Sequence, residues 1–186
     1  LGLNWHYNTG IDVPYSKKMW YNRNYINGAN NKILLSVPVK FKTSDETRHK
    51  DILIDNTKNW QKHHWKSIYI SYSNYPCFTK YENELKEVYS KKWTKLIDLN
   101  LYLMFKILGW LKVEKKIVRA SDYHLKKSKS ELIIEMCKKL KFENYLFGEL
   151  GKNYCDFKSF KESKIKAYFQ KYNHPRYKVL KNKTFY

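Results

Sequence analysis

The second half of the chain alternates between short β-rich runs and helical runs, and this alternation constrains the fold most strongly. The runs at 115–119, 145–147 and 165–169 are typical of strands, whereas Ser130–Leu140 and Phe157–Ser163 are typical of helices. Strands that alternate with helices are characteristic of a parallel sheet with right-handed crossovers. The pattern therefore predicts an α/β fold, with a mostly parallel sheet and flanking helices.

The first half predicts two more strands and an inserted helical segment at about 56–110. Lys32–Phe41 carries apolar residues at period two, and Asp51–Ile54 is a shorter β-rich run. Pro38 lies within the first run and indicates that one edge of that strand is unpaired. Three helices are expected in the inserted segment: one from Asn56 or Thr57 to before Pro76, one at Lys80–Tyr89 and one at Trp93–Leu108.

The chain is strongly basic, with 37 Lys and Arg against 17 Asp and Glu, a net charge of +20. Such a field favours polyanions, whether nucleic acid, anionic lipid headgroups or phosphorylated substrates. Only four of the basic residues are Arg, although arginine is the usual bidentate reader of phosphates and bases. An AT-rich genome would also enrich Lys, Asn, Tyr and Ile at neutral surface positions. Functional polyanion binding and genomic bias both remain open.

Several classes of protein are disfavoured by what the sequence lacks. No stretch reaches 18 consecutive apolar residues, so no transmembrane segment is predicted. Cys77, Cys137 and Cys155 lie far apart without C-x-x-C spacing, which argues against a disulfide scaffold or a cysteine-based zinc site. A reducing, cytoplasmic location is expected, and no metal or cofactor is evident. Nucleophile-elbow, H-E-x-x-H, Walker and G-x-G-x-x-G motifs are missing, which removes only the easiest enzyme assignments.

A glycine turn is the most informative local feature. Gly148 and Gly151, followed by Lys152 and Tyr154, stand between a predicted strand and a short helix. Glycines there let backbone N–H groups converge, and a helix N-terminus with Lys152 would hold an anion. The alternative is a structural turn beside a solvated lysine.

Four further candidates follow other predicted strands. Ser121 and Asp122 come after the run at 115–119, where Asp122 is either a base or a turn residue. His174, near Tyr177, offers a titratable imidazole after the last run, although a lone histidine is commonly a surface residue. Because open α/β sheets bind ligands at strand ends, Lys152, Asp122, His174 and Arg23 are expected to face one crevice.

Near the N-terminus, cations and aromatics are interleaved. Lys17, Trp20, Asn22 and Arg23 lie within seven residues. Two interpretations are open. The segment could stack a base or sugar and contact phosphate, or it could be an exposed basic turn without a ligand.

Five segments, in this order, resemble the WbqC-like protein family and together cover most of the chain. They are YSKKMWYNRNYING (15–28), LLSVPVKF (34–41), IDNTKNWQKHHWKSI (54–68), RASD (119–122) and YLFGELGKNYCDFKSFKESKIKAYFQKYNHPRY (145–177). The combination is specific, although each segment alone would be weak.

The resemblance implies a single α/β domain over 1–186, encoded among genes for O-antigen and other surface polysaccharides. Members are regarded as transferases or accessory enzymes that modify nucleotide-activated sugars, by acylating or aminoacylating an amino sugar. The implied substrate is a nucleotide-linked or lipid-linked amino sugar, and the acyl or aminoacyl donor is unidentified. The resemblance implies catalytic roles for His174 and Asp122. The implied substrate-binding positions are Lys17, Trp20, Asn22, Arg23, Ser121, Gly148, Gly151, Lys152, Tyr154 and Tyr177.

Two departures from the family pattern matter. Members usually open with a strand and an H-Q-P-x-Y-x-P-W-like segment, and they continue past the HPxY segment into a terminal helical region. This chain shows neither feature, so we expect a domain truncated at both ends, as a fragment or as a member without activity. The alternative to a transferase is a non-catalytic, strongly basic structural subunit of a larger assembly, with RNA or protein partners.

Overall fold

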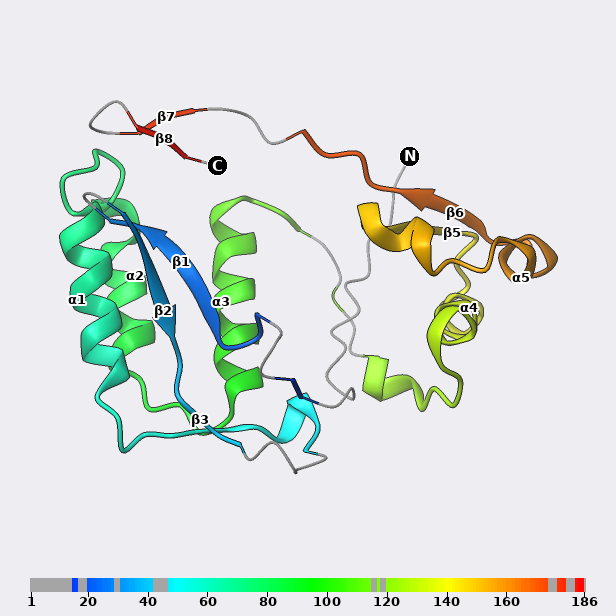
Figure 1. Ribbon diagram of the computed structural model, residues 1–186, viewed down its shortest axis with the longest axis horizontal. Coiled ribbons are helices and arrows are strands. Elements are labelled where there is room, and N and C mark those ends of the chain that lie inside the picture. Colours follow the sequence, from blue (N-terminus) through cyan, green and yellow to red (C-terminus); the bar gives the residue numbers. More distant parts are fainter. Residues whose placement is uncertain are drawn as a thin grey trace. The chain divides into compact units, whose positions relative to one another are not determined.

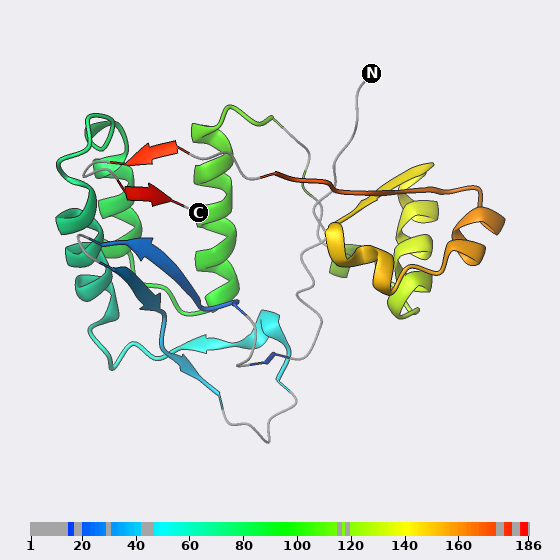
Figure 2. The ribbon, with the colours of Figure 1, turned by 45° about the horizontal axis from the view of Figure 1, so that its top comes forward.

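The fold is seen in a computed structural model. It describes residues 15–16, 20–28, 31–41, 47–114, 117, 120–173, 177–179 and 183–185. Two compact units are formed mainly by residues 10–115, the N-terminal unit, and by residues 116–179, the C-terminal unit. Figure 1 labels most of their helices and strands, and Figure 2 shows the same ribbon turned by 45°. The single domain over 1–186 stays a prediction.

The N-terminal unit begins with an antiparallel hairpin of β1 (Arg23–Asn27) and β2 (Lys32–Ser36), in which Tyr25 lies opposite Leu34. The N–H of Gly28 donates to the carbonyl of Asn31 at 3.0 Å and starts the turn. A Cβ at Gly28 would come within 2.7 Å of that carbonyl oxygen, so the turn requires glycine.

The strand predicted over 32–41 is divided in two at Pro38. After the break, β3 (Val39–Lys40) pairs in antiparallel fashion with β4 (Leu53–Ile54). Proline has no N–H to donate to a ladder, so the division at this position has a direct physical cause. A short 3-10 helix, η1 (His49–Asp51), precedes β4.

The three predicted helices are confirmed as α1 (Trp60–Tyr72), α2 (Thr79–Ser90) and α3 (Leu96–Trp110). Helix α1 begins at Trp60 rather than at 56 or 57. The reason is that the carboxylate of Asp55 accepts hydrogen bonds from the N–H and the hydroxyl of Thr57, at 3.1 and 2.6 Å. Those bonds hold residues 55–57 in a turn before the helix.

The strands and helices of the N-terminal unit share one core. Its most buried members are Tyr15, Ile52, Ile54, Trp60, Val88, Trp93, Leu96 and Leu99. The N–H of Leu96 donates to the carbonyl of Ile52 at 3.0 Å and joins the start of α3 to the end of η1.

The C-terminal unit is a compact β–α–β arrangement with one additional α-helix and two 3-10 helices. In chain order it contains η2 (Ala120–Tyr123), α4 (Lys129–Leu140), β5 (Asn144–Phe147), η3 (Glu149–Asn153), α5 (Phe157–Glu162) and β6 (Lys166–Phe169). Strands β5 and β6 are parallel, with Phe147 beside Phe169. The core comprises Ile133, Ile134, Cys137, Phe147, Phe160 and Ile165.

The α/β class is borne out, but a mostly parallel sheet is not. The strands form two-stranded sheets, of which β5–β6 is parallel whereas β1–β2 and β3–β4 are antiparallel; β7 (Tyr177–Val179) pairs with β8 (Lys183–Phe185). Parallel pairing requires a long crossover, whereas a short turn folds two strands back on each other. Ile117 is in irregular structure, and the rest of the strand predicted at 115–119 lies outside the described residues.

Within the described residues, no helix combines the length and the apolar character needed to cross a membrane.

Candidate functional site

An aromatic platform lies at the start of the β1–β2 hairpin. The Trp20 side chain is 57% exposed, and its ring centroid lies 5.5 Å from that of Tyr25. The guanidinium carbon of Arg23 lies 5.2 Å from the centre of the Trp20 ring. Arg23 and Tyr25 are two residues apart in β1 and therefore project from the same face of the hairpin. We call Trp20, Arg23 and Tyr25 the hairpin platform.

The hairpin platform is attached to the core through Tyr21. The carbonyl of Tyr21 accepts a hydrogen bond from the side-chain amide of Asn100 in α3, at 2.9 Å. Its ring stacks on buried His49 at a centroid distance of 4.3 Å. These two contacts fix the bend that carries Trp20, so the exposed indole is held by buried neighbours.

Asn22, predicted to bind substrate, is engaged with the main chain. Its side-chain amide donates to the carbonyl of Val37 at 2.8 Å, and the N–H of Val37 donates to the carbonyl of Asn22 at 2.7 Å. The structure thus gives Asn22 a role in closing the hairpin. A role in substrate binding stays a prediction.

Sequence reasoning identified Trp20 and Arg23 but missed Tyr25 and Leu34. Both missed residues are 46% exposed and lie opposite each other in the hairpin. Recognition of β1 as a strand would have placed Tyr25 on the face of Arg23. An exposed aromatic surface beside a cation can stack a base or the apolar face of a sugar and can contact phosphate.

A second cluster lies at the carboxyl ends of β5 and β6 in the C-terminal unit. The Phe147 and Phe169 rings stack at 5.2 Å with their planes 13° apart. The Lys152 ammonium lies 5.9 Å from the Phe169 ring centre, and the Tyr154 ring meets Phe147 edge-on at 5.8 Å. Ser130 holds this loop, because its hydroxyl donates to the carbonyl of Tyr154 at 3.0 Å. The structure thus brings Lys152 and Tyr154 together.

The two glycines of the predicted anion-binding turn have different roles. A Cβ at Gly151 would lie 2.4 Å from the Cβ of Phe147, whereas a Cβ at Gly148 would meet nothing within 4 Å. Gly148 has a φ of −63°, which any residue adopts. Gly151 therefore allows close packing, and the backbone does not require glycine at 148.

The N-terminus of α5, expected to help hold an anion, already carries a carboxylate. An oxygen of Asp156 accepts hydrogen bonds from the N–H groups of Lys158 and Ser159, at 3.1 and 3.2 Å. The pKa of Asp156 is lowered mainly by a hydrogen bond from the Ser159 hydroxyl to its carboxylate, and further by these two backbone bonds. An incoming anion would meet this negative charge, so anion binding at this turn depends on Lys152.

The remaining predicted site residues are only partly described. Lys17 and His174 lie outside the described residues, as do the side chains of Ser121 in η2 and Tyr177 in β7. Asp122 is exposed in η2. A crevice shared by Arg23 of the N-terminal unit with residues of the C-terminal unit stays a prediction.

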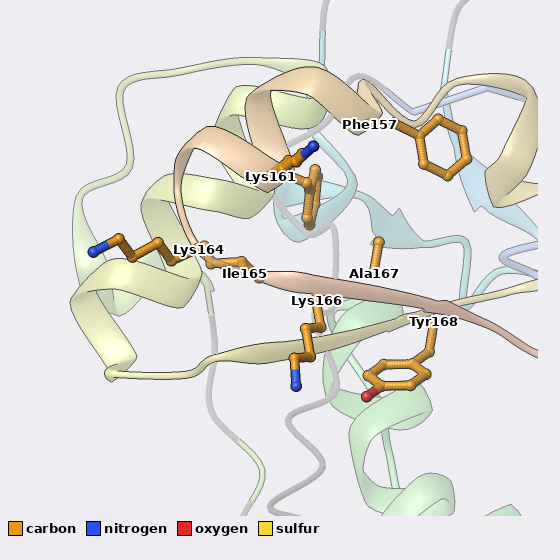
Figure 3. Close-up of a pocket in the computed structure, with 8 residues that line it drawn as sticks. Phe157, Lys161, Lys164, Ile165, Lys166, Ala167 and Tyr168 are labelled. Atoms are coloured by element: carbon orange, nitrogen blue, oxygen red, sulfur yellow. The ribbon is translucent and has the colours of Figure 1, made fainter.

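An open groove of about 700 Å³ runs between α5 and β6. Figure 3 shows its lining residues, which include Phe157, Ile165 and Ala167 together with Lys161, Lys164 and Lys166. Sequence reasoning did not identify this groove. The alternation of Lys and apolar residues over 164–168 is the signal that could have indicated an exposed strand with a mixed surface.

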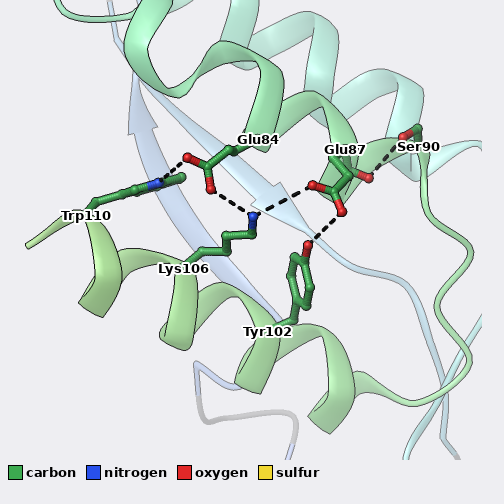
Figure 4. Close-up of polar contacts among 6 residues, drawn as sticks. All are labelled: Glu84, Glu87, Ser90, Tyr102, Lys106 and Trp110. Atoms are coloured by element: carbon green, nitrogen blue, oxygen red, sulfur yellow. Dashed lines mark hydrogen bonds and ion pairs between the residues drawn. The ribbon is translucent and has the colours of Figure 1, made fainter. Parts of the chain in front are cut away.

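A polar cluster joins α2 to α3 in the N-terminal unit (Figure 4). The Lys106 ammonium lies 2.8 Å from Glu84 and 3.7 Å from Glu87. The indole of Trp110 donates to Glu84 at 3.1 Å, and the Tyr102 hydroxyl donates to Glu87 at 2.9 Å. The hydrogen bond between Lys106 and Glu84 lowers the pKa of the carboxyl and raises that of the ammonium. Both groups stay charged at neutral pH, which suits a link between helices better than proton transfer.

No three His, Cys, Asp or Glu side chains gather as a metal site would require, within the part of the chain that the structure describes.

Two buried histidines are expected to make the stability of the N-terminal unit depend on pH. His49 is 6% exposed and its Nε2 has no hydrogen-bond partner, whereas a ring nitrogen of His64 lies 3.2 Å from the carbonyl oxygen of Ser36. Burial lowers the pKa of both imidazoles, because it penalises the charged form. Both side chains are therefore neutral in the folded protein at pH 7.

We expect the free energy of unfolding to fall as the pH drops below about 6.5, the ordinary histidine pKa. Below that pH the histidines of the unfolded chain take up protons, whereas folded His49 and His64 stay neutral until a lower pH. The stabilisation from the two neutral histidines is therefore complete above pH 6.5 and is lost as the pH falls through their lowered pKa values in the folded protein. Urea unfolding at a series of pH values measures it. His49→Phe should flatten the dependence, whereas His124→Asn, at an exposed position of the C-terminal unit, should not; equal curves for all three proteins would contradict the assignment.

Comparison with known proteins agrees with the resemblance seen in the sequence. The WbqC-like protein family matches residues 9–186. The uncharacterized protein Rv1507c of Mycobacterium tuberculosis is 29% identical over 171 residues, which cover 91% of this chain and 74% of the mycobacterial protein. No solved structure matches. Because the family match spans nearly the whole chain, this protein belongs to the WbqC-like protein family.

Proposed function

We propose that the protein is a transferase of surface-glycan biosynthesis that modifies a nucleotide-linked or lipid-linked amino sugar. Membership of the WbqC-like family supports this pathway. The proposed reaction is acyl or aminoacyl transfer, in which the sugar amine attacks the activated carbonyl of the donor. A C–N bond forms, the bond between the carbonyl carbon and the donor's leaving group breaks, and a base takes the amine proton.

The hairpin platform is the observation that carries the proposal. Trp20 and Tyr25 present adjacent exposed rings, and the Arg23 guanidinium lies 5.2 Å from the Trp20 ring centre. A nucleotide sugar offers both of the groups that such a surface recognises, namely flat or apolar ring faces and a charged diphosphate. We assign stacking to Trp20 and Tyr25, and diphosphate contact to Arg23.

The other proposed roles are those predicted from the sequence. Lys152, whose ammonium lies over the Phe169 ring, is proposed as a cation of the C-terminal unit that contacts a phosphorylated group. Asp122 or His174 is the proposed base. The three cysteines, Cys77, Cys137 and Cys155, are unpaired, which supports a reducing, cytoplasmic setting.

Calorimetric titration with UDP-N-acetylglucosamine, a stable nucleotide-linked amino sugar, tests the proposed site. We expect the chain to bind it, and Trp20→Leu to weaken binding about tenfold, because one stacked ring contributes about 1–3 kcal/mol. Arg23→Ala should weaken UDP binding as well, since it removes the cation at the diphosphate.

Tyr69→Leu is the matched control, because Tyr69 is a 45% exposed aromatic on α1 outside the hairpin platform. This variant should bind like the parent chain. Absence of binding by the parent chain, or equal affinity for the Trp20→Leu and Tyr69→Leu variants, would refute the assignment of the hairpin platform.

A second candidate function is a basic subunit that binds RNA without catalysis. The distribution of lysines favours it, because exposed lysines such as Lys62 and Lys66 of α1 and Lys80 and Lys86 of α2 are spread over helices rather than gathered in a pocket. Many dispersed phosphate contacts would make binding steeply dependent on salt.

A further inference from the structure

One edge of strand β6 has no partner strand among the described residues. The two-stranded sheet pairs β6 with β5 only. The N–H groups of Lys166 and Gln170 donate to the carbonyls of Glu143 and Phe147, at 2.7 and 2.9 Å, on the β5 side. Because successive residues in a strand direct their main-chain groups to opposite sides, Ala167 and Phe169 direct theirs to the outer edge. That edge carries hydrogen-bonding groups that another strand could use.

The outer edge runs along the groove between α5 and β6. Apolar surface is available there, because Phe157 is 57% exposed and Tyr168 is 51% exposed. Lysines 161, 164 and 166 also line the groove, and no Asp or Glu does among the described residues. The surface therefore combines apolar contacts with positive charge, next to unpaired main-chain groups.

The lysines of the groove do not converge on one point. In Figure 3 the side chains of Lys161 in α5, Lys164 in the following turn and Lys166 in β6 extend in three different directions. A compact anion such as a single phosphate would be contacted by one of them at a time. Negative charges spaced along an extended chain match this arrangement.

We propose that the α5–β6 groove binds an acidic, extended peptide segment of another protein, which adds a strand to the outer edge of β6. A peptide main chain offers alternating donors and acceptors that match the edge, and its apolar and acidic side chains would meet Phe157 and the lysines. A nucleic-acid backbone offers acceptors in place of that alternation. A second copy of this +20 chain would bring like charge to the groove, so an acidic partner is the better match.

The test measures fluorescence anisotropy of a labelled peptide of alternating glutamate and valine, EVEVEVE, with the full chain. We expect saturable binding that Lys161→Glu/Lys166→Glu weakens about tenfold or more, since close charge pairs at interfaces couple by several kcal/mol. The control variant Lys138→Glu/Lys158→Glu makes the same change in net charge with exposed lysines that do not line the groove, and it should bind like the parent chain.

Lys164 allows a third variant without a new negative charge. Its φ is 56°, a left-handed conformation that glycine adopts more readily than lysine, so the backbone accommodates Lys164→Gly, which removes the ammonium. Reduced affinity of this variant supports the groove. Equal affinity for both double variants would show that only net charge matters and would overturn the proposal.

Strand addition is separated from simple charge attraction by a peptide with the same side chains and every backbone nitrogen methylated. It keeps all its charges but can donate no ladder hydrogen bond, so we expect its binding to be lost. Equal binding of the methylated peptide would overturn strand addition. Tighter binding of oligo(U) RNA through the same three lysines would assign the groove to nucleic acid instead.

Discussion

Trp93→Ala should lower the free energy of unfolding of the N-terminal unit by about 3–5 kcal/mol, as large core truncations of aromatic residues do. The Trp93 side chain is 5% exposed and lies in the shared core. Its indole N–H donates to the carbonyl of Val88 at 2.8 Å, and its ring lies 5.1 Å from that of Tyr102. The substitution creates a cavity and also leaves the Val88 carbonyl without this donor.

Trp20→Ala is the matched comparison, because it removes the same side chain from an exposed position. Trp20 is 57% exposed, so its loss should change stability by less than about 1 kcal/mol. Urea unfolding followed by far-UV circular dichroism measures both variants. Equal destabilisation by the two substitutions would contradict the placement of Trp93 in the core and of Trp20 in the exposed hairpin platform. If the Trp20→Ala protein is folded, a loss of ligand binding by this variant is not caused by unfolding.

Gly151→Ala should destabilise the C-terminal unit by about 1–3 kcal/mol, the usual effect of overpacking. The new Cβ would stand 2.4 Å from the Cβ of Phe147 and 2.8 Å from its ring. Phe147 is 2% exposed and packs against Phe160 and Phe169, so it has little room to move. Strand β5 or turn η3 must therefore shift.

Gly148→Ala makes the same chemical change three residues earlier and should be neutral or stabilising by up to about 1 kcal/mol. Its Cβ would meet nothing within 4 Å, and its backbone conformation suits alanine. Hydrogen exchange over residues 129–169 compares the two variants in this unit, which contains no tryptophan among residues 116–179. Greater loss of protection in Gly148→Ala than in Gly151→Ala would refute the packing role of Gly151.

The elements of this chain could be predicted more accurately than their pairing. The helices α2 and α4 and the strands β5 and β6 lie within one or two residues of their predicted positions, because apolar periodicity is a local property. Strand direction depends on connections and on partners far apart in the sequence. The alternation of strands and helices predicted a mostly parallel sheet, but only the pair β5–β6 among the pairs with a described direction is parallel. Strand β1 was missed, since its sequence RNYIN contains one aliphatic residue, Ile26, and shows no alternation of apolar and polar residues.

The residues of the candidate site could likewise be predicted only in part, because some of them depend on contacts between distant segments. Trp20 and Arg23 could be identified from cations beside aromatics, and the structure adds Tyr25 through the geometry of the strand. The sequence alone does not distinguish the roles of Gly148 and Gly151. The structure does, because only Gly151 packs closely against Phe147. The groove beside β6 depends on an unpaired edge, which no local pattern reveals.

Salt dependence of binding tests most directly whether the chain recognises a nucleotide-linked sugar rather than RNA. UDP-N-acetylglucosamine and a labelled single-stranded RNA are each titrated against the purified chain at about 50 mM and about 200 mM salt. We predict measurable sugar-nucleotide binding with a shallow salt slope, corresponding to roughly two phosphate contacts, and only weak RNA binding. Tight low-salt RNA binding that falls by orders of magnitude, as roughly six or more contacts would produce, together with no sugar-nucleotide binding, would contradict it.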